Sequence, residues 1–292
     1  MSDEFAFLDA LRAIATHPAA AELADDTAVL EVAAGRLVLT SDTMVEGVHY
    51  RPHDPADAIG WKLAAVNLSD LAAKGATPIG CLLNYALSGD AEWDRAFLAG
   101  LDQALTRFAM PLLGGDTVAM PSGAPRSLTL AAIGTAPARV PLRTGARPGD
   151  ALWVTGQIGG AGFGPDGAPR DLTRYLRPQP RLAEGRAIAP LATAMMDISD
   201  GLLIDARRMA EASGIALAID LDAVPLALPG LDAIEAATAG DDYELLFTLP
   251  AGTTPPVAAT RIGAARAGAG LTLMASGAPI PLPDRLGYRH GG

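Results

Sequence analysis

The sequence predicts a two-domain protein of the α/β class, with an N-terminal mixed sheet and its helices followed by a C-terminal α/β domain. The chain has 292 residues, of which 50% are hydrophobic, so it can bury a core in each of two ordinary domains. Strand-like and helix-like apolar patterns occur in both halves. Between them, Thr135 to Asp150 is rich in proline, glycine and arginine and has no apolar periodicity. We therefore predict an N-terminal domain over residues 1–135, a connection over 136–150 and a C-terminal domain over 151–292.

The first half is predicted to contain three helices and three strands. The helices are predicted over about residues 4–16, 54–74 and 92–109, and the strands over 36–40, 111–113 and 127–133. Asp54 is placed to cap the second helix, Pro55 suits its first position, and Gly75 is placed to end it. The spacing of Trp93 and Phe97 indicates one apolar face on the third helix.

The second half is predicted to begin with a strand, and a glycine-rich stretch follows. The strands are predicted over residues 151–155 and 243–249, and the helices over about 180–192 and 200–212. Gly162, Gly164 and Gly167 match the spacing of a dinucleotide-binding loop, but Pro165 lies inside the turn and no helix opens after it. The sequence therefore argues against a dinucleotide-binding fold.

Composition and charge exclude several classes of function. The net charge is −11 and there is no long Lys/Arg run, which argues against binding of nucleic acid or of an anionic membrane. Cys81 is the only cysteine, so neither an intramolecular disulfide nor a thiolate metal cluster is expected. The N-terminus lacks the pattern of a signal peptide, and no segment reaches the roughly 20 apolar residues that span a bilayer. We therefore expect a soluble, cytoplasmic protein.

Aspartates at the ends of apolar runs are the most informative feature of the chain. They are Asp25, Asp26, Asp42, Asp70, Asp116, Asp197 and Asp200. If these carboxylates converge in one cleft, they repel one another unless cations compensate their charge. Hard oxygen ligands of this kind indicate Mg²⁺, which usually shares its coordination with substrate phosphates. The pattern therefore predicts a phosphoryl-transfer enzyme, although the P-loop and protein-kinase motifs are both missing.

Each aspartate also has a simpler interpretation when it is taken alone. Asp70 lies in a helix that is apolar nearly all round. Taken alone, a buried carboxylate there is explained by a structural role, in which it accepts hydrogen bonds from a nearby loop. Asp200 can be a simple N-cap of the helix that follows it. Asp42 and Asp116 are predicted to follow the ends of strands, where open sheets present ligands to a crevice. The glycine before Asp116 would let backbone amides approach a phosphate.

Six segments together resemble the thiamine-monophosphate kinase family. They are Asp25 to Leu30, Thr40 to His49, Ala65 to Ala73, Gly114 to Thr117, Asp197 to Leu202 and Asp241 to Leu245. They occur in the order of the family and cover almost the whole chain. The family belongs to the superfamily of aminoimidazole ribonucleotide synthetase and selenophosphate synthetase. The resemblance implies an N-terminal domain that forms a homodimer through its strands, and ATP bound between the N-terminal and C-terminal domains.

The resemblance also implies roles for individual residues. The Mg²⁺ ligands it implies are Asp26, Thr40, Ser41, Asp42, Asp70, Asp116, Asp197 and Asp200. The residues implied to contact ATP are Gly115, Asp116, Arg143 and Ser199. Those implied to contact thiamine monophosphate are His49, Asp241 and Tyr288. Three positions depart from the family: Ala24 replaces a glycine, Asp241 replaces a glutamate, and the stretch from Gly159 to Arg170 is shortened.

The reaction implied is in-line transfer of the γ-phosphate of ATP to the phosphate of thiamine monophosphate. The second pKa of a phosphate monoester is about 6, so no general base is required. A related aminoimidazole ribonucleotide synthetase-like enzyme, or a nucleotide-binding protein without catalysis, are the alternatives. Selenophosphate synthetase is disfavoured, because its reactive N-terminal cysteine or selenocysteine has no counterpart here.

Overall fold

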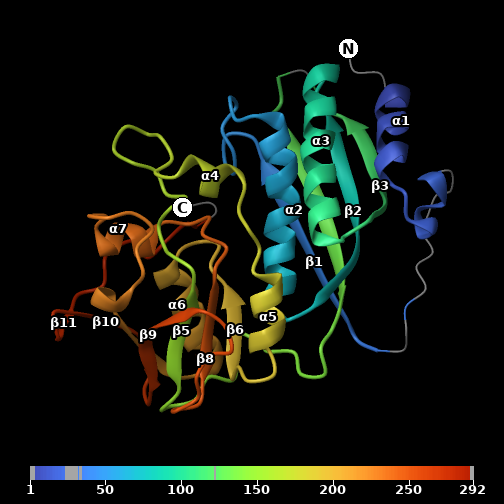
Figure 1. Ribbon diagram of the computed structural model, residues 1–292. Coiled ribbons are helices and arrows are strands. Elements are labelled where there is room, and N and C mark those ends of the chain that lie inside the picture. The colour runs from blue at the N-terminus through green and yellow to red at the C-terminus, as the bar shows by residue number, and fades with distance from the viewer. Residues whose placement is uncertain (1–3, 24–31, 33–34, 122, 290–292) are drawn as a thin grey trace. The chain divides into compact units, whose positions relative to one another are not determined.

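The structure is a computed structural model that describes residues 4–23, 32, 35–121 and 123–289 (Figure 1). The chain divides into two compact units, residues 1–71 with 77–136 and residues 72–76 with 137–292. Each unit contains one β-sheet and several helices. The predicted α/β class is therefore confirmed. In the described part of the chain, no helix is long and apolar enough to cross a membrane.

The first unit is built on a four-stranded sheet with the order β1-β4-β2-β3. Its strands are β1 (Leu37–Val45), β2 (Thr77–Leu87), β3 (Leu112–Ala119) and β4 (Ser127–Thr135). β4 is antiparallel to both β1 and β2, whereas β2 and β3 are parallel. β1 and β3 are thus the two edges of this sheet.

Helices cover one face of the four-stranded sheet (Figure 1). They are α1 (Glu4–Ile14), the 3-10 helix η1 (Pro18–Leu23), α2 (Ala56–Ala72) and α3 (Ala91–Phe108). The Phe7 ring stacks on Tyr85 of β2 with centroids 4.3 Å apart. α2 and α3 pack closely, because a Cβ on Gly100 would lie 1.7 Å from the carbonyl oxygen of Asp57. α2 is buried along almost its whole length, as expected from a sequence that is apolar nearly all round from Leu63 onwards.

The opposite face of the four-stranded sheet is exposed. Leu39 of β1, Leu82 of β2 and Val118 of β3 point to this face, and Leu39 is 68% exposed. Side chains alternate between the faces of a strand, so Thr40 and Asp42 point to the helix-covered side. β1 therefore presents Leu39 to solvent on one face, and Thr40 and Asp42 to the helices on the other.

The second unit is built on a seven-stranded sheet with the order β11-β10-β7-β9-β5-β8-β6. Its strands are β5 (Ala151–Thr155), β6 (Ala194–Asp197), β7 (Ala216–Asp220), β8 (Leu245–Leu249), β9 (Ala259–Arg266), β10 (Gly270–Ala275) and β11 (Ala278–Ile280). Its helices are α4 (Leu172–Leu176), α5 (Leu182–Ile188), α6 (Leu202–Ser213), the 3-10 helix η2 (Leu221–Ala223) and α7 (Ala233–Thr238). α6 packs against β6, β7 and β10, and apolar residues such as Leu203, Met209 and Leu217 form the core.

The structure corrects several predicted boundaries. β1 continues to Val45 and β3 to Ala119, so Asp42 and Asp116 lie inside strands rather than after them. Backbone pairing with β4 and β2 continues past both carboxylates and lengthens the strands. α5 ends at Ile188 instead of continuing to residue 192, because Pro190 interrupts helical hydrogen bonding.

Candidate functional site

In the first unit, β1 and α2 bring together three residues of the predicted site. The hydroxyl of Thr40 donates a hydrogen bond to Oδ2 of Asp70, and Asp42 lies two residues further along β1. The backbone N–H of Asp42 donates to Oδ1 of Asn67 over 3.1 Å. Asn67 is fully buried and its amide donates to the carbonyl of Leu63, 3.0 Å away. Asn67 and Asp70 are three residues apart on α2 and therefore lie on one face of the helix. From this face they bond Asp42 and Thr40, which are two residues apart on β1.

Electrostatics identify Asp42 and Asp70 as an interacting pair. Burial, and then the charge of Asp70, raise the pKa of Asp42 to about 6. Two carboxylates in this relation repel each other, and a hard divalent cation would relieve the repulsion. Ser41, also a predicted ligand, is exposed and points to the other face of β1. The structure therefore does not bring the Ser41 side chain together with Thr40 and Asp42.

Gly115 and Asp116 lie on the opposite edge of the sheet. Gly115 has a φ of 154°, and a Cβ there would lie 1.7 Å from the carbonyl oxygen of Leu83, so only glycine fits without a shift. Asp116 is exposed, and its Oδ1 accepts the backbone N–H of Thr117 over 2.9 Å. Asp42 pairs with Leu130, which pairs with Leu83, which pairs with Gly115. Three strand spacings separate the two edges, or about 14 Å.

His49 lies in the turn after β1, where hydrogen bonds of both its ring and its backbone hold it. Its Nδ1 accepts the backbone N–H of Val45 over 3.0 Å, so in the neutral ring the proton is on Nε2. Its carbonyl accepts a hydrogen bond from Nζ of Lys62, 3.3 Å away, and Lys62 is only 3% exposed. The sequence did not indicate this buried lysine. The imidazole can therefore act as a donor through Nε2.

In the second unit, predicted ligands lie on the loop between β6 and α6. Asp197 ends β6, and Ser199 and Asp200 follow it. The side chain of Asp205 holds this loop, because its Oδ2 accepts the backbone N–H groups of Ser199 at 3.2 Å and of Asp200 at 3.1 Å. Burial raises the pKa of Asp205, and the adjacent Arg208 opposes that rise. Neither Asp205 nor Arg208 was among the predicted site residues.

Two predicted substrate residues are bonded to the same loop. The backbone N–H of Asp241 donates to the carbonyl of Ser199 over 2.8 Å, and that of Tyr288 donates to the carbonyl of Asp200 over 2.9 Å. The structure therefore brings Ser199, Asp200, Asp241 and Tyr288 together, although they are spread over 90 residues of sequence. Arg143, the predicted ATP contact of the connection, is exposed.

Glu244, close to this cluster in the sequence, is a buried carboxylate whose ion pair with the partly exposed Arg181 was not predicted. Glu244 is 2% exposed and accepts two hydrogen bonds from Arg181, at 2.7 Å from Nε and 2.6 Å from Nη2. The hydroxyl of Thr155 donates a third, at 2.7 Å. Asp242 accepts the backbone N–H of Gly159 at 2.9 and 3.1 Å, and burial raises its pKa well above the usual value. The sequence feature that could have indicated this contact is the position of Glu244, an acidic residue directly before the apolar run of β8.

The oxygen donors of Thr40, Asp42 and Asp70 are of the kind that Mg²⁺ prefers. Among the described residues, no group of three or more His, Cys, Asp or Glu side chains is placed to hold a metal ion. Mg²⁺ usually takes one or two carboxylates and fills its other positions with water and phosphate oxygens. The Asp42 and Asp70 pair beside the Thr40 hydroxyl is such a donor set. The predicted ligand Asp26 lies outside the described residues.

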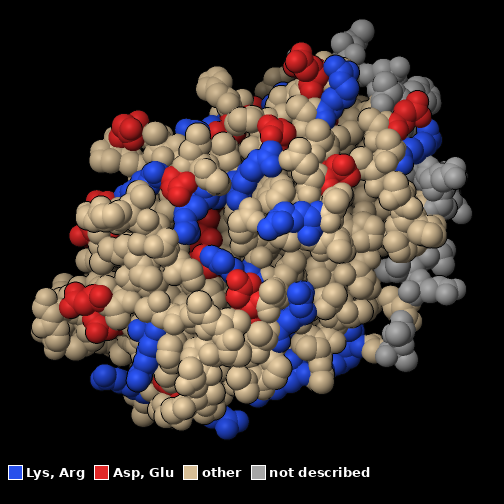
Figure 2. All heavy atoms as spheres, in the orientation of Figure 1, with Lys and Arg blue, Asp and Glu red and all other residues tan. Residues whose placement is uncertain are grey.

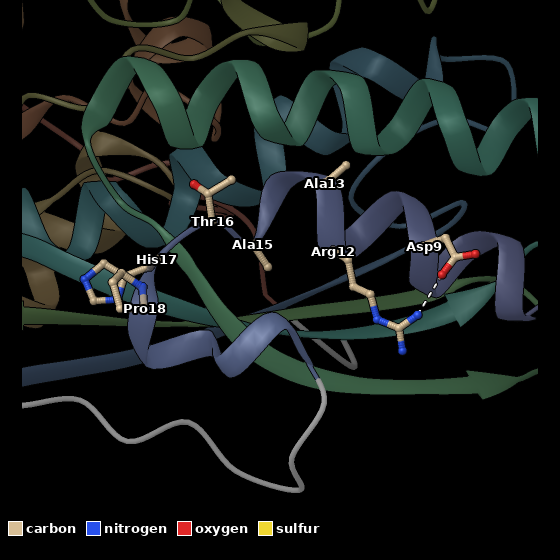
Figure 3. Close-up of a pocket in the computed structure, with 7 residues that line it drawn as sticks. All are labelled: Asp9, Arg12, Ala13, Ala15, Thr16, His17 and Pro18. Atoms are coloured by element: carbon tan, nitrogen blue, oxygen red, sulfur yellow. Dashed lines mark hydrogen bonds and ion pairs between the residues drawn. The ribbon is translucent and has the colours of Figure 1, made fainter.

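Two surface features do not belong to this site. A pocket of about 930 Å³ lies between α1 and η1 (Figure 3). Its lining consists of Asp9, Arg12, Ala13, Ala15, Thr16, His17 and Pro18, none of them a predicted site residue. Arg12 is paired there with Asp9 at 2.6 Å. Figure 2 shows acidic and basic side chains interspersed on the face drawn, without a continuous basic surface on that face.

Comparison with known proteins gives consistent matches over the chain. Residues 24–136 match the family AIR synthase related protein, N-terminal domain, and residues 147–255 match its C-terminal domain. A thiamine-monophosphate kinase of Caulobacter vibrioides is 36% identical, over 94% of this chain and 86% of that protein. The crystal structure of thiamine-monophosphate kinase from Stenotrophomonas maltophilia is 34% identical with a TM-score of 0.80, over 94% of this chain and 96% of that one. The structure of AaThiL complexed with AMPPCP and TMP is 28% identical with a TM-score of 0.77, over 98% and 97% of the two chains.

Proposed function

Because this chain belongs to the thiamine-monophosphate kinase family, we propose that it uses Mg²⁺ to transfer the γ-phosphate of ATP to thiamine monophosphate. The products are thiamine diphosphate and ADP. The observation that carries the proposal is the repelling pair of Asp42 and Asp70 beside the Thr40 hydroxyl, which is suited to a hard cation.

The residues of the chain position the two substrates, and proton transfer is not their task. A terminal oxygen of the acceptor phosphate is the nucleophile, and with a second pKa of about 6 it is largely deprotonated near neutral pH. The main barrier is the approach of two anions, which positioning and charge neutralisation lower. No general base is assigned, in keeping with a chain that has only four histidines.

Magnesium is assigned to oxygen donors of both units. In the first unit we assign Thr40, Asp42 and Asp70, which the contact of Thr40 with Asp70 and the repulsion between the two aspartates support. In the second unit we assign Asp197, at the end of β6, and Asp200, in the loop that follows. The resemblance to the family adds Asp26, Ser41 and Asp116. When bound, Mg²⁺ neutralises charge on the phosphate oxygens.

The substrates are assigned to different parts of the chain. For ATP we assign Gly115 and Asp116 of β3, Arg143 and Ser199; the guanidinium of Arg143 suits phosphate oxygens. For thiamine monophosphate we assign His49, Asp241 and Tyr288. The hydrogen bonds of Asp241 and Tyr288 to one loop support their common assignment.

A homodimer formed through the first unit is part of the same proposal. Among the described strands, β1 and β3 are the edges of the sheet, and the sheet face they share exposes Leu39 and Val118. Edge strands and apolar faces of this kind favour association. Asp42 and Gly115 lie at the same level on opposite edges. Pairing of β1 with β3 of a second copy would bring them close together. We also propose a cytoplasmic location, where ATP is available.

The proposal is tested by measuring ADP release from the purified protein with ATP and Mg²⁺, with and without thiamine monophosphate. We expect ADP only when all three are present, and thiamine diphosphate as the product identified by mass spectrometry. ATP binding without this product would move the assignment to an aminoimidazole ribonucleotide synthetase-like enzyme. Failure to bind ATP would contradict catalysis altogether.

A further inference from the structure

Arg208 makes an ion pair with Asp200, one of the proposed Mg²⁺ ligands. Its Nη1 lies 2.5 Å from Oδ2 of Asp200 and 2.7 Å from Oδ1 of Asp205. One terminal nitrogen therefore bridges two carboxylates, one assigned to the metal and one that holds the loop backbone. A guanidinium and a divalent cation would compete for the negative charge of the Asp200 carboxylate.

The three side chains differ in their access to solvent. The side chain of Asp205 is 1% exposed, whereas those of Asp200 and Arg208 are 22% and 36% exposed. A cation arriving from solvent can thus reach Asp200 but not Asp205. Asp205 is bonded to the loop backbone through Oδ2, so it remains in place and can keep Arg208 through Oδ1 after Asp200 has been released.

We propose that Arg208 is a positioning residue that neutralises Asp200 in the metal-free protein and is displaced from it, while remaining bonded to Asp205, when a divalent cation binds. The inference rests on the proposed function, because it takes Asp200 as a metal ligand. Arg208 thereby lowers the affinity for a divalent cation and prevents an unpaired carboxylate in the metal-free loop.

Mn²⁺ binding tests this role without requiring catalysis. Free Mn²⁺ is measured by electron paramagnetic resonance in the absence of ATP and thiamine monophosphate. We expect Arg208→Gln to lower the Mn²⁺ Kd about tenfold, because the cation no longer has to break a charge-assisted hydrogen bond. Gln retains an amide donor for Asp205. The matched control is Arg207→Gln, which removes the same charge from the neighbouring residue; Arg207 pairs with Glu211 at 3.4 Å, not with Asp200.

Two further variants make the test specific. In an Asp200→Asn background, Arg208→Gln should no longer raise Mn²⁺ affinity, since the competition involves that carboxylate. If Arg208→Gln does not fold, Asp205→Asn with Arg208→Gln leaves no buried unpaired charge, and the same gain relative to Asp205→Asn alone is expected. Circular dichroism verifies that each variant is folded.

The outcomes separate this role from the proposed function. If Arg208→Gln binds Mn²⁺ no more tightly than the wild type and Arg207→Gln do, the proposed role of Arg208 is wrong. That result would leave the kinase proposal unaffected. Equal Mn²⁺ binding by the wild type and Asp200→Asn overturns both this role and the assignment of Asp200 to the metal. An inactive wild type whose Asp200-dependent Mn²⁺ affinity still rises in Arg208→Gln contradicts the kinase proposal alone.

Discussion

Tyr243 donates a hydrogen bond of 2.9 Å from its hydroxyl to Oδ1 of Asp241, two residues earlier in the chain. Both residues have left-handed backbone conformations, with φ of 66° at Asp241 and 51° at Tyr243. Such conformations are uncommon for residues other than glycine and often occur at functional sites. Backbone hydrogen bonds from both residues to the 198–199 segment hold them in place. The Asp241 carboxylate is thus oriented by its own loop.

We predict that Tyr243→Phe raises the KM for thiamine monophosphate about tenfold, because a hydrogen bond to a charged group contributes about 1.5–3 kcal/mol. The KM for ATP serves as the internal control and should change little. Steady-state kinetics with each substrate varied in turn gives both constants. An equal rise in the two KM values would show that Tyr243 supports the loop in general and not the Asp241 carboxylate.

Asp70→Asn should abolish turnover while the protein remains folded. The substitution keeps an oxygen that can accept the hydrogen bond from Thr40 but removes the charge that Mg²⁺ needs. Product formation is followed by ADP release, and the fold by circular dichroism and thermal unfolding. Wild-type rates in this variant would contradict the assignment of Asp70 to the metal.

The stability of the metal-free protein should fall as pH rises from about 4 to about 6. The pKa of Asp42 is about 6 in the folded protein, against about 3.9 for an unperturbed aspartate. Between these values the folded state binds more protons than the unfolded state, so the free energy of unfolding decreases with increasing pH. Asp42→Asn should flatten this dependence and raise the Tm at pH 7.

Thermal unfolding in EDTA across this pH range provides the measurement. Asp116→Asn is the matched control, because Asp116 is an exposed aspartate on the other edge of the same sheet. If the two variants have the same pH profile, the Asp42 and Asp70 repulsion does not govern the stability of the metal-free protein.

The sequence predicts the fold class better than it predicts the positions of individual residues. The burial of α2 and the pairing of Asp70 with a polar partner follow from a segment that is apolar from Leu63 to Ala72 apart from Asn67, Ser69 and Asp70. Strand ends do not follow from composition, because Asp42 and Asp116 occupy strand positions where backbone pairing outweighs low β-propensity. β2 was not predicted, since its apolar run does not distinguish a strand from a buried helix segment.

The sequence also did not predict which basic side chains pair with the carboxylates of the site. Arg208 follows Asp200 by eight residues, and Arg181 precedes Glu244 by 63. Arginines at such separations carry no local pattern, and only the folded chain shows which carboxylates they meet. The loop contacts of Tyr288 are of the same kind.

Leu39→Lys should shift a homodimer towards the monomer. Leu39 is 68% exposed on the edge strand β1, and a charge there opposes both edge pairing and burial of an apolar face. Light scattering after size-exclusion chromatography gives the mass. The control is Leu172→Lys in the second unit, a leucine that is 52% exposed. A wild-type protein that is monomeric at micromolar concentration would contradict the dimer.

Glu244→Gln should destabilise the second unit by about 1.5–3 kcal/mol, the usual contribution of a hydrogen bond to a charged group. Glu244 is almost completely buried and accepts hydrogen bonds from Arg181 and Thr155. Its amide analogue retains one acceptor oxygen but leaves the guanidinium without its full counter-charge. The matched control is Glu184→Gln, since Glu184 pairs with the same arginine at 3.5 Å but is 31% exposed. Loss of such an exposed pair costs at most about 1 kcal/mol. Urea unfolding followed by intrinsic fluorescence gives both values, and similar losses in the two variants would show that burial of Glu244 does not set the strength of this contact.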